Sequence, residues 1–246
     1  MNATELYRAG RLDDAIQALG AALRNDPADV QRRSFLFELL CFAGEYDRAE
    51  KQLDILAGGG PQAEIGTLVY RGALHAERTR QEMFTSGRLP ESGREARAVR
   101  GTLNGLSFEA LADADPRLGA RLEVLAGGQY LWIPLEHIES IRMEPPRQLR
   151  DLLWAPAIVR TGPSFRGVEL GEVLVPVLTP LAWRHADDAV RLGRVTEWES
   201  LGDGAEAPAG QKLFLVDGEE LPILEVRELL ITPLDATQDP ISNVLP

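Results

Sequence analysis

The sequence predicts an α+β protein in two parts, a helical N-terminal domain followed by a mostly antiparallel α+β domain. Three observations lead to this prediction: repeated Gly, Ala, Leu and Pro positions in the first third of the chain, turn formers at residues 86–93, and short apolar or alternating segments after Leu122. We expect a helical domain over residues 1–85 and an α+β domain over residues 94–246, with the turn formers between them.

The helical domain is predicted from an internal repeat. Four positions return after 34 residues, the tetratricopeptide period: Gly10, Ala15, Leu19 and Pro27 are followed by Gly44, Ala49, Leu53 and Pro61. Glycine permits a tight turn between antiparallel helices, and alanine lets the second helix approach the first. The repeat therefore predicts a tetratricopeptide-like domain of two helical hairpins, which opens with a capping box from Asn2 and Glu5.

A third copy of the repeat is incomplete, because Arg78 and Met83 stand where it needs a glycine and a small residue. A single helix from about Ile65 to Glu82 remains, and it has a narrow apolar face at helical spacing. That face consists of Ile65, Leu68, Val69, Gly72, Ala73 and Ala76. Since so short an array usually needs another unit for stability, we expect this helix to cap the stack.

The second domain is predicted to begin with helical segments over residues 94–100 and 107–115 and to continue as strands. The strand segments are LEVL, GGQYLWIP, IESIRME, PAIVR, GEVLVPVL, LGRVTEW and QKLFLVDGEELPIL. Turns are expected at Gly127-Gly128 and at Asp217-Gly218, of which the second is a strong hairpin signal. We interpret residues 199–210 as an exposed loop and expect a mobile tail from about Asp235.

Composition excludes several classes of function. The net charge is −12 and the pI is about 4.8, whereas binding to nucleic acid or anionic lipid needs clustered Lys and Arg. The start of the chain lacks the apolar stretch of a secretory signal, and no segment has the roughly 20 apolar residues of a membrane span. Cys41 is the single cysteine, which fits a reducing compartment. We expect a cytoplasmic protein that binds neither nucleic acid nor membrane.

Catalytic and metal-binding motifs are missing from the sequence. The three histidines (His75, His137 and His185) lack metal-ligand spacing, so we expect no metal and no cofactor. GPSFRG at residues 162–167 has its second glycine one position late for a nucleophile elbow, and we interpret Ser164 as a turn residue. The adjacent carboxylates Asp187-Asp188 and Glu219-Glu220 are interpreted as solvated surface charge, which leaves no catalytic residue.

Binding is favoured over catalysis. By the repeat register, the first helices of the two units direct residues to the inner face, where such domains hold a peptide or helix. The predicted partner-binding residues are Tyr7, Arg8, Ser34, Glu38 and Phe42. Packing against the capping helix is the alternative for Phe42 and for its neighbour Cys41, which we expect to be a small buried hydrophobe.

Three motifs in the second half of the chain are specific. Tyr130 and Trp132 lie in QYLWIP, Asp151 and Trp154 in RDLLW, and Arg194 and Trp198 in LGRVTEW. With the surrounding segments, these motifs resemble the ImpE family, also called SciE or TagJ, and the resemblance extends over the whole chain. We expect the three tryptophans to lie in the core, and we interpret Asp151 and Arg194 as a buried pair that supports it.

The resemblance to the ImpE family implies a non-enzymatic accessory role in bacterial type VI secretion. It implies binding to the small sheath subunit and a link to ClpV, the AAA+ ATPase that dismantles contracted sheath. Two alternatives remain open. One is a scaffold that joins the baseplate or the ATPase without contacting sheath, and the other is a hydrolase that uses carboxylates in a cleft of the C-terminal domain.

Overall fold

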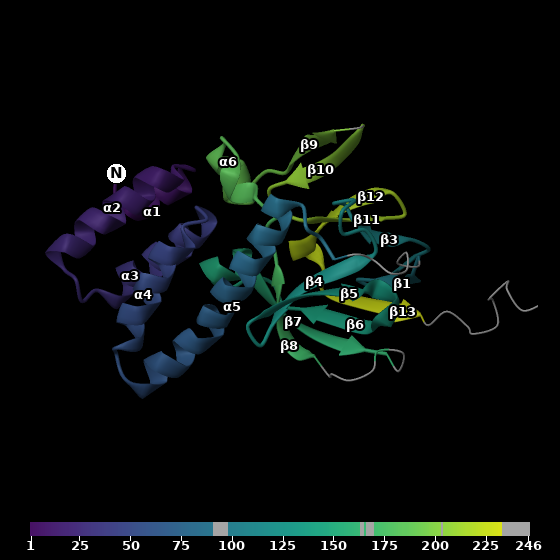
Figure 1. Cartoon of the computed structure of the whole chain (residues 1–246), viewed down its shortest axis with the longest axis horizontal. Helices are drawn as coiled ribbons and strands as arrows, with labels where there is room; N and C mark the ends of the chain where they lie inside the picture. The colour runs from purple at the N-terminus through teal and green to yellow at the C-terminus, as the bar shows by residue number, and fades with distance from the viewer. Residues whose placement is uncertain (91–97, 163–164, 166–169, 203, 233–246) are drawn as a thin grey trace, which may run out of the picture.

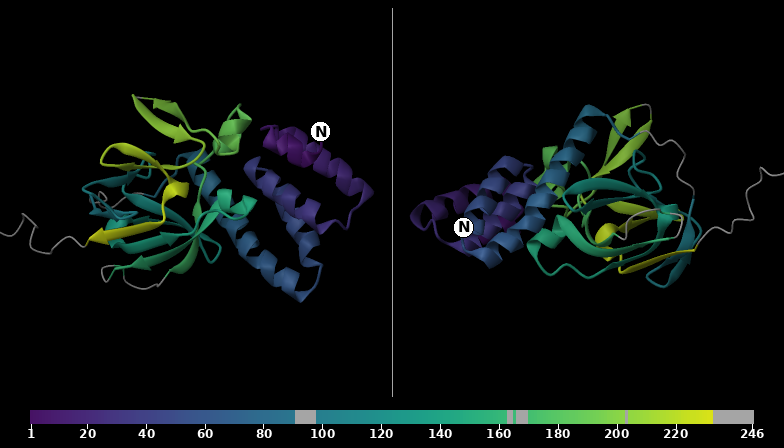
Figure 2. Two further views of the ribbon diagram at one scale, coloured as in Figure 1. Left: turned by 180° about the vertical axis from the view of Figure 1, so that it is seen from behind. Right: turned by 60° about the horizontal axis from the view of Figure 1, so that its bottom comes forward.

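The computed structural model describes residues 1–90, 98–162, 165, 170–202 and 204–232. Helices make up the first part of the chain and strands most of the second, and the two parts lie side by side (Figures 1 and 2). The predicted order, a tetratricopeptide-like helical region followed by a mostly antiparallel region, is confirmed.

The helical part consists of two hairpins and one long helix. The hairpins are α1 (Ala3–Arg8) with α2 (Leu12–Asn25) and α3 (Val30–Phe42) with α4 (Tyr46–Ala57), and α5 (Pro61–Ser86) follows. Gly10 and Gly44 make the two hairpin turns at φ of +74° and +71°, where any other residue would be strained. Asn2 and Glu5 form the expected capping box at the start of α1.

The described residues of the second part form three sheets. The largest has the strand order β2-β1-β13-β6-β7-β8-β4-β5, and the smaller ones are β12-β11-β3 and β10-β9. The strands are β1 (Arg100–Leu103), β2 (Leu106–Phe108), β3 (Leu111–Asp113), β4 (Arg121–Ala126), β5 (Gln129–Pro134), β6 (Ile138–Met143), β7 (Trp154–Thr161), β8 (Gly171–Pro176), β9 (Glu197–Gly202), β10 (Ala205–Ala209), β11 (Leu213–Val216), β12 (Glu219–Pro222) and β13 (Glu228–Thr232). Every pairing between these strands is antiparallel.

Short helical turns connect some of the strands. They are η1 (Leu135–His137), η2 (Leu149–Leu152), η3 (Ala182–Arg184), α6 (Asp188–Arg191) and η4 (Ile223–Glu225). The two turns predicted from sequence are confirmed, since Gly127-Gly128 joins β4 to β5 and Asp217-Gly218 joins β11 to β12. All four turn residues have positive φ, as such hairpin turns require.

Two sequence predictions about local structure are wrong. Residues 107–115 were expected to be helical but contain β2 and β3. Asn104 and Gly105, at φ of 50° and 84°, turn the chain so that β2 pairs with β1. β3 pairs with the distant strand β11, and these pairings override the local helical preference. Residues 199–210, expected to be a loop, form most of the β9–β10 hairpin around Gly202 and Gly204.

Other predictions fall on the boundary of the described chain. Residues 94–97, Ser164 and the tail from Asp235 lie outside the described residues. Arg100, at the end of the first expected helical segment, lies in β1. Within the described ranges, no helix is both long enough and apolar enough to span a membrane.

Helix α5 buries only part of its predicted apolar face. Ala73 and Ala76 are buried, but Ile65, Leu68 and Val69 are 67%, 58% and 58% exposed. The prediction that the whole face caps the stack is therefore wrong for these three aliphatic residues.

The position of the sheet explains this division. Gly72 lies against Gly128 in the β4–β5 turn, so closely that a Cβ atom on Gly72 would be 3.3 Å from the Gly128 Cα atom. The C-terminal half of α5 packs on β4 and β5, whereas the N-terminal half extends past the turn (Figure 1). We call the exposed residues Ile65, Leu68 and Val69 the helix stripe.

The hydrophobic core has two clusters that meet at the large sheet. One fills the second part of the chain between the large sheet and η4, and includes Val124, Val159 and Phe214. The other fills the helical part but also includes Leu125, Leu153, Trp154 and Leu192 from the second part. The helical repeats therefore complete their core with side chains from the β-rich part.

Candidate functional site

A segment that we call the strap, residues 178–194, crosses the ends of the helical hairpins. It contains η3 and α6 and begins at the end of β8. On α5, Gln81 Oε1 accepts hydrogen bonds from the Leu181 backbone N–H at 3.0 Å and from Trp183 Nε1 at 3.1 Å. Trp183 then covers the second hairpin turn, where a Cβ atom on Gly44 would lie 2.4 Å from its ring.

The strap also binds the first hairpin turn. Arg194 donates hydrogen bonds to the carbonyl oxygens of Tyr7 and Arg8 at 2.6 and 3.1 Å, and these carbonyls end α1. Asp188 Oδ2 accepts a hydrogen bond from the Leu12 backbone N–H at 2.8 Å, at the start of α2, which has no capping side chain of its own. The strap therefore caps both helices of the first repeat with charges that suit their dipoles.

A buried ionic cluster joins α5 to the sheets. Arg80 donates from Nε to Glu123 Oε1 at 2.7 Å and from NH1 to Glu77 Oε1 at 2.9 Å. Lys212 contacts Asp113 Oδ2 at 2.5 Å and also pairs with Glu123. Arg80, Lys212 and Glu123 are 1%, 2% and 1% exposed. The cluster connects the helical part, β4, β3 and the residue before β11.

Burial and pairing act in opposite directions in this cluster. Burial alone would raise the pKa of Glu123, but the charges of Arg80 and Lys212 hold that pKa well below its usual range. For Asp113 burial has the larger effect and raises the pKa to about 6, in spite of Lys212. Removing Arg80 would therefore leave Glu77 buried without this partner and Glu123 with Lys212 as its remaining counter-charge, which is costly.

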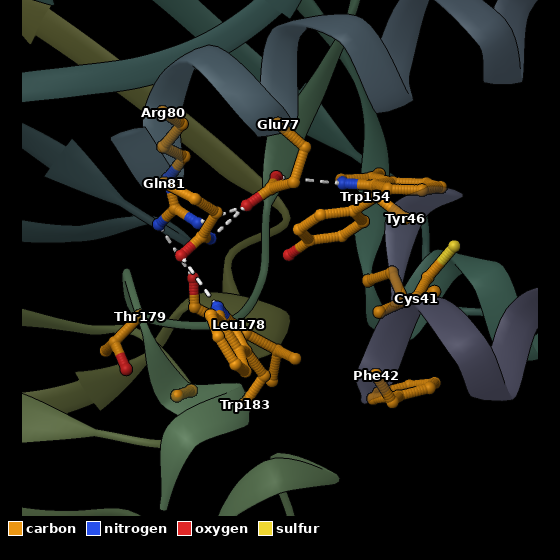
Figure 3. A pocket seen from close by; sticks show the side chains of 12 residues that line it. Cys41, Phe42, Tyr46, Glu77, Arg80, Gln81, Trp154, Leu178, Thr179 and Trp183 are labelled. Atoms are coloured by element: carbon orange, nitrogen blue, oxygen red, sulfur yellow. Dashed lines mark hydrogen bonds and ion pairs between the residues drawn. The ribbon is translucent and has the colours of Figure 1, made fainter. Parts of the chain in front are cut away.

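A small cavity of about 20 Å³ lies where the two parts meet, which is space for about one water molecule. Figure 3 shows Glu77, Arg80 and Gln81 from α5 on one side, Trp154 and Trp183 from the second part, and Cys41 and Phe42 from the end of α3. Trp154 Nε1 donates to Glu77 Oε2 at 3.2 Å. Burial raises the pKa of the Cys41 thiol well above its ordinary value, in line with its predicted role as a buried hydrophobe.

Comparison with known proteins gives matches over both parts of the chain. The profile of the tetratricopeptide repeat matches residues 6–69 and that of the ImpE protein family matches residues 105–230. A Pseudomonas aeruginosa protein named type VI secretion system accessory component TagJ is 35% identical, over 96% of this chain and 93% of its own length. The chain belongs to the ImpE family.

A solved structure shows the same fold as this ImpE-family chain. Protein VPA1032 from Vibrio parahaemolyticus, known from a crystal structure, aligns with a TM-score of 0.83 at 23% identity. The alignment covers 95% of this chain and 98% of that protein. The whole arrangement of helical repeats and sheets is therefore shared by the two proteins.

The residues of the three sequence motifs have separate structural roles. Tyr130 donates a hydrogen bond to Glu123 of the ionic cluster, and Trp132 Nε1 donates to Tyr130. Trp154 is buried at the cavity, as expected, whereas Trp132 is half-buried and Trp198 is 40% exposed. The prediction of three core tryptophans is therefore correct for Trp154 and wrong for Trp198, which lies on the β9–β10 hairpin away from both clusters.

The predicted pairing of Asp151 with Arg194 is also wrong. Asp151 Oδ2 accepts hydrogen bonds from the backbone N–H groups of Arg147 and Gln148 at 2.8 and 2.9 Å and so caps η2. Arg194 is used at the α1–α2 turn. Asp151 and Arg194 each form hydrogen bonds with backbone groups at a helix end. This role depends on local geometry, which the spacing of the two residues in the sequence does not reveal.

Four of the five predicted partner-binding residues lie at contacts with the strap or η2, and the fifth, Ser34, bonds within its own helix. The Tyr7 ring stacks under the Arg194 guanidinium at 4.8 Å, and the Arg8 carbonyl accepts from Arg194. Glu38 Oε1 lies 3.7 Å from Arg150, and burial raises the pKa of Glu38 to about 7 against this positive charge. Phe42 is fully buried, and the Ser34 hydroxyl donates to the Val30 carbonyl oxygen.

Intramolecular contacts thus occupy much of the expected inner face. Binding of a partner by these five residues stays a prediction, and Phe42 offers no surface for it. Sequence reasoning missed Arg80, Glu123 and Lys212, although Glu123 stands out as a charge inside the apolar segment LEVL. It also assigned the helix stripe to the core, because periodicity identifies an apolar face but not what covers it.

Proposed function

We propose that this protein is a non-enzymatic, cytoplasmic accessory adaptor of a bacterial type VI secretion system that binds a helical segment of the small sheath subunit. The observation that carries the proposal is the match, over nearly the full length of both chains, to the Pseudomonas aeruginosa protein named as an accessory component of that system. We propose further that this binding links the sheath to ClpV. A scaffold that joins the baseplate or the ATPase without sheath contact is the alternative.

The helix stripe is the proposed docking surface for the sheath segment. Ile65, Leu68 and Val69 lie within about one helical turn and expose most of their side-chain surface, on an element that is otherwise anchored by the sheet. An amphipathic helix binds such a surface through apolar side chains at spacings of three and four. Carboxylate chemistry is less favoured, because Glu123 and Asp113 are paired in the core and Asp187 and Asp188 cap helices.

The test is a calorimetric titration of the purified small sheath subunit into the protein. We expect a dissociation constant on the order of micromolar and a negative heat-capacity change, since apolar surface is buried. Leu68→Glu should weaken binding at least about tenfold, which is roughly 1.4 kcal/mol. Leu106→Glu is the matched control, because Leu106 is also an exposed leucine and lies in β2, at the opposite end of the large sheet from β5.

The outcomes separate the two levels of the proposal. No binding by the wild type at about 100 μM, roughly a hundredfold above the expected constant, rejects the sheath subunit as the partner. If the wild type binds and neither Leu68→Glu nor Leu106→Glu changes the affinity, the sheath subunit remains the proposed partner. The helix stripe is then rejected as its docking surface. Circular dichroism of both variants checks that they fold.

A further inference from the structure

The β9–β10 hairpin is a two-stranded sheet that projects from the body of the molecule. It is not hydrogen-bonded to any other strand of the described chain, and Figures 1 and 2 show it extending beyond the other sheets. All six residues of β9 are exposed, including Trp198 at 40% and Leu201 at 42%. An isolated two-stranded ribbon is marginally stable in water, so an exposed one with apolar side chains suits a partner that adds to it.

The register of the hairpin shows that one edge of β9 is open. Trp198 lies opposite Pro208, which has no backbone N–H and therefore must occupy a pair without mutual hydrogen bonds. The N–H and C=O groups of Trp198 consequently point away from β10, toward the outer edge of β9. Among the described residues no strand lies on that edge, and unpaired groups of this kind are a template for an added strand.

Carboxylates lie beside Trp198 on its own face of the hairpin, whereas Arg117, Arg184 and His185 line a hollow with Glu199, which is on the other face of β9. Trp198 Nε1 donates to Glu220 Oε1 of β12 at 3.2 Å. Glu206 lies opposite Ser200 on the same face as Trp198, since cross-strand partners share a face. The only Lys or Arg between residues 195 and 226 is Lys212, which is buried and paired with Asp113 and Glu123. The exposed charge of these two hairpins is therefore carried by carboxylates.

We propose that the outer edge of β9 docks an extended, basic segment of another protein, which adds as a strand beside Trp198. The segment would pair its backbone with that of Trp198, place Lys or Arg side chains beside Glu206 and Glu220, and lay one of them over the indole ring. Charge complementarity selects this occupant. A second copy of this chain, with a net charge of −12, would bring like charge to the same face.

This surface is distinct from the helix stripe. The hairpin lies beside the strap and the C-terminal end of α5, whereas the stripe lies near the N-terminal end of the same helix (Figure 1). The two surfaces give the molecule one apolar and one acidic docking face. An adaptor with both can hold two partners of different chemistry at once.

The test uses the full-length protein and two fluorescein-labelled ten-residue peptides. One alternates Arg with Val and Thr, and the other has Glu in place of each Arg. Fluorescence anisotropy should show the basic peptide binding at least tenfold more tightly than the acidic one. Amide chemical-shift changes from nuclear magnetic resonance should include Trp198 and its neighbours in β9. Trp198→Thr, which keeps strand propensity, should weaken binding of the basic peptide at least fivefold.

A charge-matched pair of variants separates local docking from general attraction. Glu206→Gln with Glu220→Gln removes two carboxylates beside Trp198 and should weaken binding about tenfold. Glu64→Gln with Glu139→Gln removes the same total charge from α5 and β6 and should change binding less than twofold. Three results would each overturn the proposal: equal weakening by the two double variants, shift changes that leave β9 unaffected, or no preference of the wild type for the basic peptide up to 1 mM.

Discussion

The two halves of helix α5 reverse the usual distribution of side chains. The C-terminal half is buried against the sheets, yet it contributes Glu77, Arg80 and Gln81. The N-terminal half buries Thr67, yet it exposes the aliphatic side chains of Ile65, Leu68 and Val69 to solvent. Buried charge is costly and rarely adds net stability, but its hydrogen bonds fix one geometry. We infer that the buried half determines how the two parts of the molecule are joined, while the exposed half retains apolar surface for a partner.

The largest expected effect is on the buried half. Arg80→Met should lower the free energy of unfolding by about 3 to 5 kcal/mol, because Glu123 and Glu77 stay buried with less counter-charge. Arg78→Met on the same helix removes only partly exposed pairs with Asp47 and Glu50, and should cost less than about 1 kcal/mol. Urea unfolding followed by circular dichroism measures both.

Substitution in the exposed half of α5 should have little effect in the same urea unfolding measurement. Leu68→Ser should change the free energy of unfolding by less than about 0.5 kcal/mol, since the side chain is largely in solvent. If Leu68→Ser destabilises the protein as much as Arg80→Met does, the stripe is part of the core and the division of α5 into two functions is wrong.

A smaller effect should appear as pH dependence at the junction. Glu38 has a pKa of about 7 in the folded protein, above its ordinary value of 4.5. The folded state therefore binds more protons than the unfolded state between these values, and stability should fall as pH rises from about 5 to 8. Glu38→Gln should reduce this fall by about 1 kcal/mol, measured as urea midpoints across the range. Asp113, with a pKa of about 6, should account for part of the remainder.

A pair of glycine substitutions in α5 locates the boundary between the two halves. Gly66→Ala should stabilise the protein by about 0.5 to 1 kcal/mol, because nothing lies near its added Cβ atom and alanine favours helix. Gly72→Ala should give no such stabilisation, since the added Cβ atom would lie in close contact with the backbone of Gly128. Thermal melts of the two variants should therefore differ by a few degrees. If the two variants are stabilised equally, the contact between α5 and the sheet begins C-terminal to Gly72.

Sequence reasoning succeeded where structure depends on local backbone requirements. Gly10 and Gly44 have positive φ at the hairpin turns, so their spacing, together with that of the Ala, Leu and Pro pairs, identifies the repeat, and Asp217-Gly218 identifies a hairpin in the same way. The family motifs also located the second domain. Reasoning from sequence failed for Ser107 to Asp115, where the Asn104-Gly105 turn pairs β2 with β1 and where β3 pairs with β11, a strand distant in sequence.

The junction could not be predicted for a similar reason. Arg80 meets Glu123 across 43 positions and Lys212 meets Glu123 across 89, and no local pattern specifies such encounters. The spacing of apolar residues predicts the apolar face of α5. Whether a sheet or solvent covers Ile65 depends on where the β4–β5 turn ends, which the spacing does not show. For the same reason Tyr7 and Arg8 were assigned to an open face that the strap in fact reaches.

The cap that Asp188 gives to helix α2 also affects how the chain is made. Leu12 and Asp188 are 176 positions apart, which at a synthesis rate of about 5 to 20 residues per second is a delay of roughly 9 to 35 seconds. During that interval the first repeat has left the ribosome with an uncapped helix and without Trp183 or Arg194 over its turns. The N-terminal repeats, although first to be synthesised, would reach their final stability last, after most of the β-rich part exists.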